Sequence, residues 1–318
     1  MTDNDSGRNQ YDVVVVGGGA AGLSAALVLS RARRRVAVVD AGAPRNASAA
    51  HMQGFLSRDG MAPGDLLAAG RAEVQRYGGQ LVAGTVTGVD RGGGPGLRVL
   101  LSTGPQLTTR RLILATGLRD ELPDVPGVRE RWARDLLHCP YCHGYEVRDQ
   151  ELGVMGGTPD AVQHALLVRQ WSPDVVFFPH TDTLTADDRE QLTALGIGIV
   201  EGSVARLVVD DDHLRGIELD NGTTVRRTAV FVRPRLTPNT DLLAGLGCAI
   251  DDNGWVKVDP SGRTNAPGVW VAGNAANPRA QVITAAGEGS SVAIAVNADL
   301  VGEDVQQAVA ASRSGDTT

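Results

Sequence analysis

Residues 11–40 read YDVVVVGGGAAGLSAALVLSRARRRVAVVD, and this stretch decides the fold. A short β-rich run ends at Val16, a glycine-rich turn follows, residues 23–30 have helical apolar spacing, and a second strand ends in Asp40. Strand, glycine turn, helix, strand and acid in this order predict a dinucleotide-binding unit. The residues expected to contact the dinucleotide are Gly17, Gly19, Ala20, Ala21, Gly22 and Asp40.

Each glycine of this turn has a physical reason to be a glycine. Gly17 permits the tight turn, Gly19 lets a pyrophosphate approach the backbone, and Gly22 lets the helix pack closely on the strand. The first N–H groups of the helix can bind the phosphates. Asp40 lies 18 residues after Gly22, which suits a pair of ribose hydroxyls. The motif alone does not separate FAD from NAD.

The composition is that of a globular protein long enough for two domains. Of its 318 residues, 42% are hydrophobic and 21% are charged. The net charge of −7 provides no basic field, so no nucleic-acid partner is expected. We see no signal peptide and no apolar run of about 18 residues, which predicts a cytoplasmic protein without a membrane partner. Residues 92–96, GGGPG, are interpreted as a hairpin loop, and the polar tail from Ser312 as disordered.

Two later segments extend the nucleotide site. Residues 111–117, RLILATG, are typical of a strand that runs into a turn of small residues. Residues 265–274, NAPGVWVAGN, end a further strand in Gly-Asn, and a helix opens shortly afterwards. The candidate cofactor-binding residues of these segments are Ala115, Thr116, Gly117, Gly273, Asn274, Ala280, Gln281 and Val282.

Residues 138–146, HCPYCHGYE, contain two of the three cysteines, with a histidine on each side. A cysteine pair at this spacing indicates redox or metal chemistry, and a structural disulfide is not expected in a cytoplasmic protein. Zinc would need four ligands. His138, Cys139, Cys142 and His143 are four candidates, but adjacent side chains point apart. We therefore predict a redox pair and no metal.

With these motifs in this order, the chain resembles the low-molecular-weight thioredoxin reductases over nearly its whole length. The resemblance implies an α/β fold of two Rossmann-like, three-layer ββα dinucleotide-binding domains, the second inserted in the first. Residues 1–116 and 246–318 would form the FAD-binding domain, and residues 117–245 the inserted domain with the CxxC pair. It also implies a homodimer. Two positions depart from the family pattern: Asn274 replaces the acid of the C-terminal GD motif, and His143 replaces the acid that follows the second cysteine.

The second nucleotide-binding segment departs further from that pattern. In residues 152–161, LGVMGGTPDA, the glycine that would let the pyrophosphate approach has become Thr158, and Pro159 removes a backbone donor. Residues 179–183, PHTDT, contain no arginine or lysine to hold a 2′-phosphate. These defects predict poor binding of NADPH. The alternative is a loose NADH site.

The combination is similar to the FAD-dependent dithiol oxidases, which close the intramolecular disulfides of natural products such as holomycin and gliotoxin. This resemblance implies a small-molecule dithiol as substrate and O2 as electron acceptor, giving hydrogen peroxide. It also implies that the catalytic residues are Cys139, attacked by the substrate, Cys142, which lies against the flavin, and His143, the base for the substrate thiol. A base suits thiol oxidation because the thiolate is the nucleophile, and histidine has a reference pKa of about 6.5.

Other interpretations of the chain and of single residues stay open. It could be an NAD(P)H-dependent thioredoxin or disulfide reductase, or a flavin-loaded redox sensor without turnover. His143 could instead be a structural histidine, and the roles of His138 and His51 are open. Cys248 lies in an apolar run and is interpreted as a buried free thiol. Pro140 is expected at a helix start, which would place the Cys139 thiol near the positive end of that helix.

Overall fold

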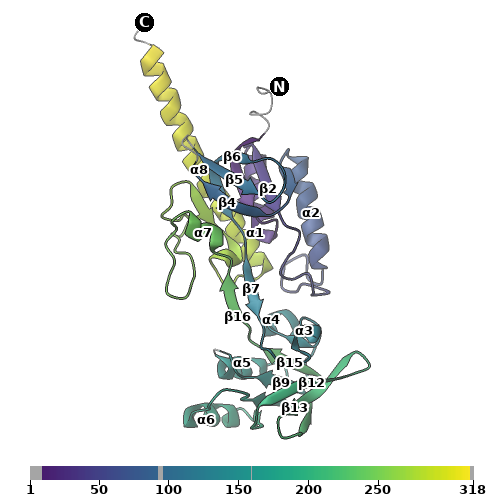
Figure 1. Cartoon of the computed structure of the whole chain (residues 1–318). Helices are drawn as coiled ribbons and strands as arrows, with labels where there is room; N and C mark the ends of the chain where they lie inside the picture. Colours follow the sequence, from purple (N-terminus) through teal and green to yellow (C-terminus); the bar gives the residue numbers. More distant parts are fainter. Residues whose placement is uncertain (1–8, 92–95, 159, 316–318) are drawn as a thin grey trace. The chain divides into compact units, whose positions relative to one another are not determined.

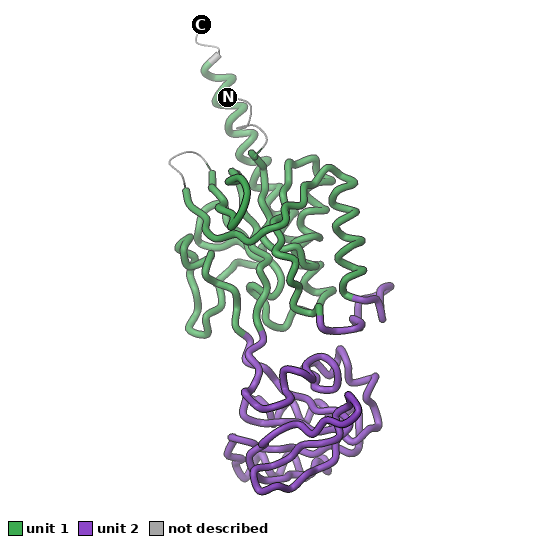
Figure 2. Tube along the Cα trace, turned by 45° about the vertical axis from the view of Figure 1, so that its right-hand side comes forward, with its two compact units in different colours: residues 1–47, 63–119, 237–318 green, residues 48–62, 120–236 purple. Residues whose placement is uncertain are grey.

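The computed structural model of the chain, drawn in Figure 1, describes residues 9–91, 96–158 and 160–315. The chain divides into two compact units (Figure 2). Unit 1 contains residues 1–47, 63–119 and 237–318, and unit 2 contains residues 48–62 and 120–236. Unit 2 therefore interrupts unit 1 along the chain. Residues 237–245, which the sequence boundary assigns to the inserted domain, lie in unit 1.

Unit 1 is built on a seven-stranded sheet in the order β3-β2-β1-β6-β5-β4, with β17 also paired to β6. The pairs among β1, β2, β3, β6 and β17 are parallel, whereas β4 and β5 form an antiparallel hairpin beside β6. Residues 92–95 of the predicted hairpin loop lie outside the described residues. The elements are β1 (Gln10–Val16), α1 (Ala20–Arg31), β2 (Val36–Asp40), α2 (Pro63–Arg76), β3 (Gln80–Ala83), β4 (Val86–Asp90), β5 (Leu97–Leu101), β6 (Leu107–Leu114), α7 (Asp241–Gly245), β17 (Val269–Val271), the 3-10 turn η1 (Gly273–Ala275) and α8 (Val282–Gly315).

Alternation along β1 produces the three layers of unit 1. Val13 and Val15 pack on one face of the sheet in a core with side chains of α1, α2 and α8. Val14 and Val16 point to the opposite face, into a core with side chains of β4, β5 and α7. Because both faces of β1 are covered, its run of four valines is continuous rather than alternating with polar residues, as is usual for a buried parallel strand.

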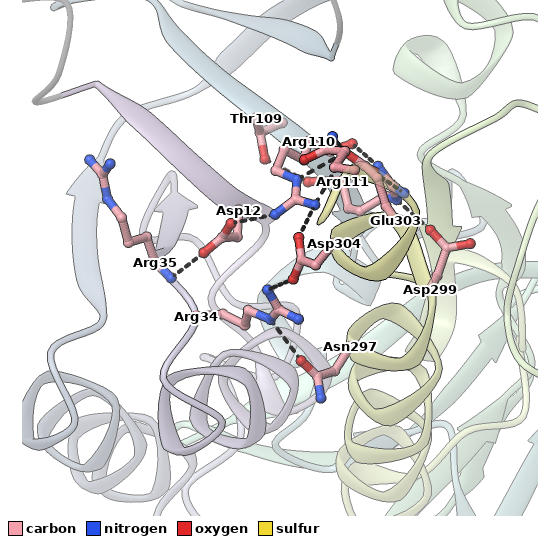
Figure 3. A network of polar contacts seen from close by, with 11 residues as sticks. Asp12, Arg34, Arg35, Thr109, Arg110, Arg111, Asn297, Asp299, Glu303 and Asp304 are labelled. Carbon is pink, nitrogen blue, oxygen red and sulfur yellow. Dashed lines mark hydrogen bonds and ion pairs between the residues drawn. The ribbon is translucent and has the colours of Figure 1, made fainter. Parts of the chain in front are cut away.

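The long helix α8 is tied to the sheet by a network of ion pairs, shown in Figure 3. Arg110 on β6 bonds Asp12 on β1 at 3.1 Å and Asp304 on α8 at 2.5 Å. Arg34, which follows α1, bonds the same Asp304 at 2.7 Å. The arginines of the network therefore connect β1, β6 and the end of α1 to one turn of α8.

Unit 2 repeats the three-layer plan around a five-stranded parallel sheet in the order β11-β10-β9-β15-β8. One face of this sheet packs against α5 and α6, and the other against the antiparallel sheet β12-β13-β14. The prediction of two Rossmann-like domains is confirmed. The elements are α3 (Val128–Arg131), β8 (Leu136–Leu137), α4 (Pro140–His143), β9 (Leu152–Met155), α5 (Ala161–Val168), β10 (Val175–Phe178), α6 (Ala186–Ala194), β11 (Gly198–Ile199), β12 (Val204–Asp210), β13 (His213–Leu219), β14 (Thr224–Arg226) and β15 (Ala229–Val232), while β7 (Leu118–Glu121) and β16 (Arg235–Pro238) pair as a separate two-stranded sheet where the chain crosses between the units.

Candidate active site

The glycine turn of unit 1 is closed on its inner side and open on its outer side. A Cβ on Gly17, whose φ is +104°, would lie 2.3 Å from the Ala115 carbonyl oxygen, and one on Gly22 would lie 1.9 Å from the Gly17 oxygen. A Cβ on Gly19 would meet nothing within 4 Å. Gly19 is also the residue that caps the N-terminus of α1. The turn thus holds the first amides of α1 at an open face, which fits a bound pyrophosphate.

Asp40 ends β2 beside this turn. Its carboxylate accepts a hydrogen bond from the Gly18 amide at 3.1 Å and pairs with Arg71 of α2 at 3.1 Å. This fixes the acid at the place where a ribose diol is bound in dinucleotide folds. Arg71 was not anticipated from the sequence, because nothing in its spacing relates it to the glycine motif.

The turn after β6 is held by hydrogen bonds to Asn239, which lies 123 residues later in the sequence. Thr116 donates through its hydroxyl to the Asn239 carbonyl at 3.2 Å, and the Asn239 side-chain amide donates to the Thr116 carbonyl at 2.8 Å. Ala115 donates its amide to the Val16 carbonyl at 2.8 Å, and Gly117 has a φ of +68°. The predicted Ala-Thr-Gly turn therefore lies directly beside the glycine turn of β1.

The loop after β17 uses the amide of Asn274, at the position where the resemblance to thioredoxin reductases implies an acid. The side chain of Asn274 donates through Nδ2 to the carbonyls of Asn277 at 2.9 Å and Ala280 at 3.0 Å. A carboxylate could make neither donation. Asn274 therefore shapes the loop that leads into α8, where Gln281 and Val282 lie. The amide of Gly273 donates to Glu288 of α8 at 3.0 Å, a contact that was not predicted.

In unit 2, Cys139 and Cys142 form a disulfide with their Cα atoms 5.2 Å apart. Cys139 caps the short helix α4, its Sγ accepting from the Cys142 amide at 3.2 Å, and Pro140 is the first residue of that helix. The prediction that Pro140 starts a helix next to Cys139 is confirmed. Proline suits this position because its missing N–H would have no helical partner there.

His143 is the last residue of α4 and is half-buried. Burial lowers its pKa below the usual 6.5, and the negative charge of Glu146 partly opposes that shift. The imidazole is therefore neutral near pH 7 and can accept a proton. Geometry and charge are compatible with the predicted role of a base.

The ring of Trp171 packs against α4 and the residue that follows it. Gly144 is buried, and a Cβ on it would lie 2.5 Å from the Pro140 carbonyl oxygen and 2.8 Å from the ring of Trp171. Tyr141, between the two cysteines, is 63% exposed and packs edge-to-face with Trp171, with ring centroids 5.6 Å apart. Trp171 was not predicted, because it lies far from the cysteines in the sequence. Tyr141 offers an aromatic face next to the disulfide.

The second glycine turn, after β9, is crossed by the loop that follows β10. The Asp182 carboxylate accepts from the Gly157 amide at 2.8 Å, in the same way that Asp40 accepts from Gly18 in unit 1. The carboxylate lies where binding of a 2′-phosphate would need a basic cluster, and Arg189 is paired with Glu201 at 2.5 Å. A 2′-phosphate at this turn would face a negative charge. Pro159 lies outside the described residues.

The remaining candidates are placed as follows. Cys248 is a buried free thiol, as predicted, and donates to Thr264 at 3.7 Å. His51 is exposed in the segment 48–62. Across the described ranges, no three His, Cys, Asp or Glu side chains converge so as to hold a metal ion. In the same ranges, no helix combines the length and the apolar character needed to cross a bilayer.

A family model described as pyridine nucleotide-disulphide oxidoreductase matches residues 11–298. The chain belongs to this family. Members of the thioredoxin-reductase branch of the family bind FAD, and FAD is the cofactor of this chain. The open face at Gly19, the Asp40 carboxylate and the Asn274 loop fit that cofactor in unit 1.

Solved structures and curated relatives agree with the family. HlmI has a TM-score of 0.93 at 59% identity, covering 95% of this chain and 96% of its own. An oxidoreductase from Agrobacterium tumefaciens has a TM-score of 0.86 at 36% identity, covering 92% and 99%. Thioredoxin reductase sirT of Leptosphaeria maculans is 33% identical over 313 residues, covering 93% of this chain and 96% of sirT. The predicted resemblance to thioredoxin-reductase-like flavoproteins is confirmed, and the chain is an oxidoreductase.

Proposed function

We propose that this flavoprotein oxidises a small-molecule dithiol to an intramolecular disulfide, with O2 as the final electron acceptor. The observation that carries the proposal is the Cys139–Cys142 disulfide on α4 with a neutral, half-buried histidine directly after it. A thiolate is the species that attacks a disulfide, so a base beside the pair favours the direction from substrate thiol to protein disulfide. The similarity to HlmI at 59% identity supports a shared activity.

In the proposed reaction, His143 accepts the proton of one substrate thiol, and the thiolate attacks Sγ of Cys139. Cys142 leaves as a thiolate while a mixed disulfide forms. The second substrate thiolate then attacks the substrate sulfur of that mixed disulfide and expels Cys139, which releases the cyclic product. FAD, which the glycine turn, Asp40 and the Asn274 loop of unit 1 would hold, would supply the two-electron chemistry that returns the Cys139–Cys142 dithiol to the disulfide at the expense of O2. Overall, two hydrogens leave the substrate and one hydrogen peroxide forms for each disulfide made.

The partners and setting belong to the same proposal. Substrate and O2 are the only reactants, and the protein works as a homodimer in the cytoplasm without contacting nucleic acid or a membrane. The exposed ring of Tyr141 next to the disulfide suits a flat, sulfur-rich ring system better than a protein surface, because ring stacking needs only one open face.

A second function, an NAD(P)H-dependent disulfide reductase, is favoured by one observation. The contact between Asp182 and the Gly157 amide repeats the contact between Asp40 and Gly18, and such an acid binds the diol of a dinucleotide that lacks a 2′-phosphate. In this function NADH would reduce FAD, and the disulfide would reduce an external substrate. Several relatives that bear the name thioredoxin reductase agree with it.

Anaerobic stopped-flow mixing separates the two functions. The oxidised holoprotein is mixed with dithiothreitol, NADH or NADPH while flavin absorbance is followed. The proposal expects rapid bleaching by the dithiol, very slow bleaching by either nucleotide, and one peroxide per disulfide when air is admitted. Rapid bleaching by NADH would establish the reductase instead. Bleaching by the dithiol in Cys142→Ser at the wild-type rate would remove the cysteine pair from the reaction.

A further inference from the structure

A buried histidine in unit 2 has no part in the reaction described above. His164 lies on α5 and is 6% exposed. Its ring is 6.3 Å from the ring of His138, centroid to centroid, and it meets Phe231 of β15 edge-on at 6.0 Å. On its other side, His138 stacks on Trp132 at 6.4 Å. Four rings therefore form a row from the end of α3 to β15.

His164 is more than a packing residue in this row. Its imidazole faces the backbone of His138, and this polar interaction partly opposes the lowering of the His164 pKa. Its Nδ1 atom is buried and meets no hydrogen-bond partner within the part of the chain that the structure describes. A leucine would fill the same volume without burying an unsatisfied nitrogen, and buried unsatisfied groups in native structures frequently have a functional cause.

His138, which His164 contacts, directly precedes Cys139 of the disulfide. β8 ends at Leu137, His138 follows, and Cys139 is the N-cap of α4. The orientation of Cys139 Sγ depends on the backbone of the residue before it, because that residue sets where α4 begins. A polar interaction with the backbone of His138 and a ring contact to its side chain fix this junction from below.

We propose that His164 is a positioning residue of the redox centre, which holds the His138 junction and thereby sets the reactivity of the Cys139–Cys142 disulfide toward thiols. The inference rests on the proposed role of that disulfide as the redox pair. His164 touches neither sulfur, so it acts through His138.

The charges around His164 keep it neutral. The groups that face it are His138 and Arg233 at the end of β15, and Arg233 is itself paired with Asp160 at the N-terminus of α5 at 3.3 Å. Burial, followed by the electrostatic effects of His138 and of Arg233, lowers the pKa of His164 to about 4. The polar interaction with the His138 backbone therefore keeps one form throughout the pH range in which thiols exchange.

The test compares His164→Leu with His164→Gln and with Phe231→Leu as a matched control. His164→Gln keeps a side-chain N–H that reaches the His138 backbone, and His164→Leu removes it. Phe231→Leu removes a ring that touches His164 from the other side, so it perturbs the same core and leaves the polar interaction. All three are studied as holoprotein, with melting temperature and FAD content measured first.

The readout is the equilibrium of the protein disulfide with dithiothreitol buffers at pH 6 to 8, followed by thiol trapping and mass spectrometry. We expect His164→Leu to shift that equilibrium about tenfold, which is about 30 mV for a two-electron couple, and to change its exchange rate. His164→Gln should stay near wild type, and Phe231→Leu should lose stability without a shift. If His164→Leu does not fold, His164→Asn replaces it, because the shorter asparagine side chain places its N–H donor farther from the His138 backbone.

Equal loss of stability in the leucine variants with no shift in either would overturn the inference, since His164 would then only pack. The measurement uses neither the natural substrate nor O2. A shift in His164→Leu together with failed oxidase turnover in the wild-type protein would therefore disprove the proposed function while leaving this inference standing.

Discussion

Single glycines in the turn after β1 separate a requirement of the fold from a requirement of the cofactor. A methyl group on Gly22 would lie 1.9 Å from the Gly17 oxygen, whereas one on Gly19 meets no protein atom within 4 Å. Gly22→Ala should therefore destabilise even the FAD-free protein, by about 1–3 kcal/mol. Gly19→Ala should destabilise the FAD-free protein less than Gly22→Ala does, because only the N-cap preference for glycine over alanine is lost. It should weaken FAD about tenfold or more, about 1.4 kcal/mol. Thermal unfolding of FAD-free protein and fluorescence titration with FAD measure the two effects. Equal effects of both changes on the FAD-free protein would contradict this division.

The pH profile of His143 follows from the direction of its pKa shift. Only the neutral imidazole accepts a proton, and its pKa lies below 6.5. Base catalysis should therefore be fully present at pH 7 and be lost as the pH falls through that lowered pKa. His143→Ala should slow anaerobic flavin reduction by a dithiol about 100-fold near neutral pH and lose the acid limb of the profile.

Glu146→Gln is the matched variant for that profile. The charge of Glu146 raises the pKa of His143, so its removal should move the acid limb to lower pH without slowing the reaction at pH 7. Stopped-flow rates between pH 5 and 8 give both profiles. An acid limb that stays in place in Glu146→Gln, or survives in His143→Ala, would assign it to another group.

At the level of the secondary-structure elements, the spacing of apolar residues and the positions of the glycines predicted the unit around the first glycine turn well. The helix expected over residues 23–30 is α1, Ala20–Arg31, and the strand expected to end in Asp40 is β2. These succeed because the apolar spacing and the glycines act locally. The prediction for the C-terminal tail was wrong. Residues from Ser312 were expected to be disordered, but α8 continues to Gly315. The alanine-rich residues 308–311 are strong helix formers, which carries the helix onward.

The candidate site could be predicted only where its residues share a local motif. Cys139, Cys142 and His143 stand together in the sequence, so their proximity needed no fold. Trp171 contacts Tyr141 of α4, and His164 contacts His138, which precedes that helix. A lone histidine in the apolar run of α5 is indistinguishable from a core residue. Tertiary packing alone identifies them.

Because α8 packs on α1, two glycine-to-alanine substitutions on α8 are expected to change the free energy of unfolding in opposite directions. A Cβ on Gly289 would lie 2.0 Å from the Ala21 carbonyl oxygen of α1, and one on the exposed Gly302 meets nothing within 4 Å. Gly302→Ala should stabilise by about 0.5–1 kcal/mol, because alanine favours the helix. Gly289→Ala should destabilise by about 1–3 kcal/mol. Thermal unfolding of both holoproteins measures the difference. Two shifts of the same sign would show that α1 and α8 are not in close contact at Gly289.

On the scale of the whole molecule, the chain uses one architecture twice with different results. Both units carry a glycine turn whose middle amide donates to a carboxylate, Gly18 to Asp40 and Gly157 to Asp182. In the first unit the next residue is Gly19, with an open face; in the second it is Thr158, and buried Ala161 stands where the first unit has its third glycine. The first turn retains the geometry for a pyrophosphate, whereas the second has side chains where that ligand needs bare backbone.

Because the residues expected to bind FAD lie in unit 1 and the disulfide lies in unit 2, the two functions should be separable by mutation. Cys142→Ser should keep wild-type FAD content and stability and lose flavin reduction by dithiols, since no sulfur pair can form. Gly19→Ala, purified without FAD, should still exchange its Cys139–Cys142 disulfide with dithiothreitol at a rate near that of FAD-free wild type.

Flavin absorbance and thiol trapping on the same samples measure both properties. The expected pattern is reciprocal: the first variant binds FAD without a functional disulfide, and the second has a functional disulfide and weakened FAD binding. Loss of FAD in Cys142→Ser would show that the disulfide helps to hold the cofactor. Loss of disulfide exchange in Gly19→Ala would show that the fold of unit 2 depends on the cofactor turn of unit 1.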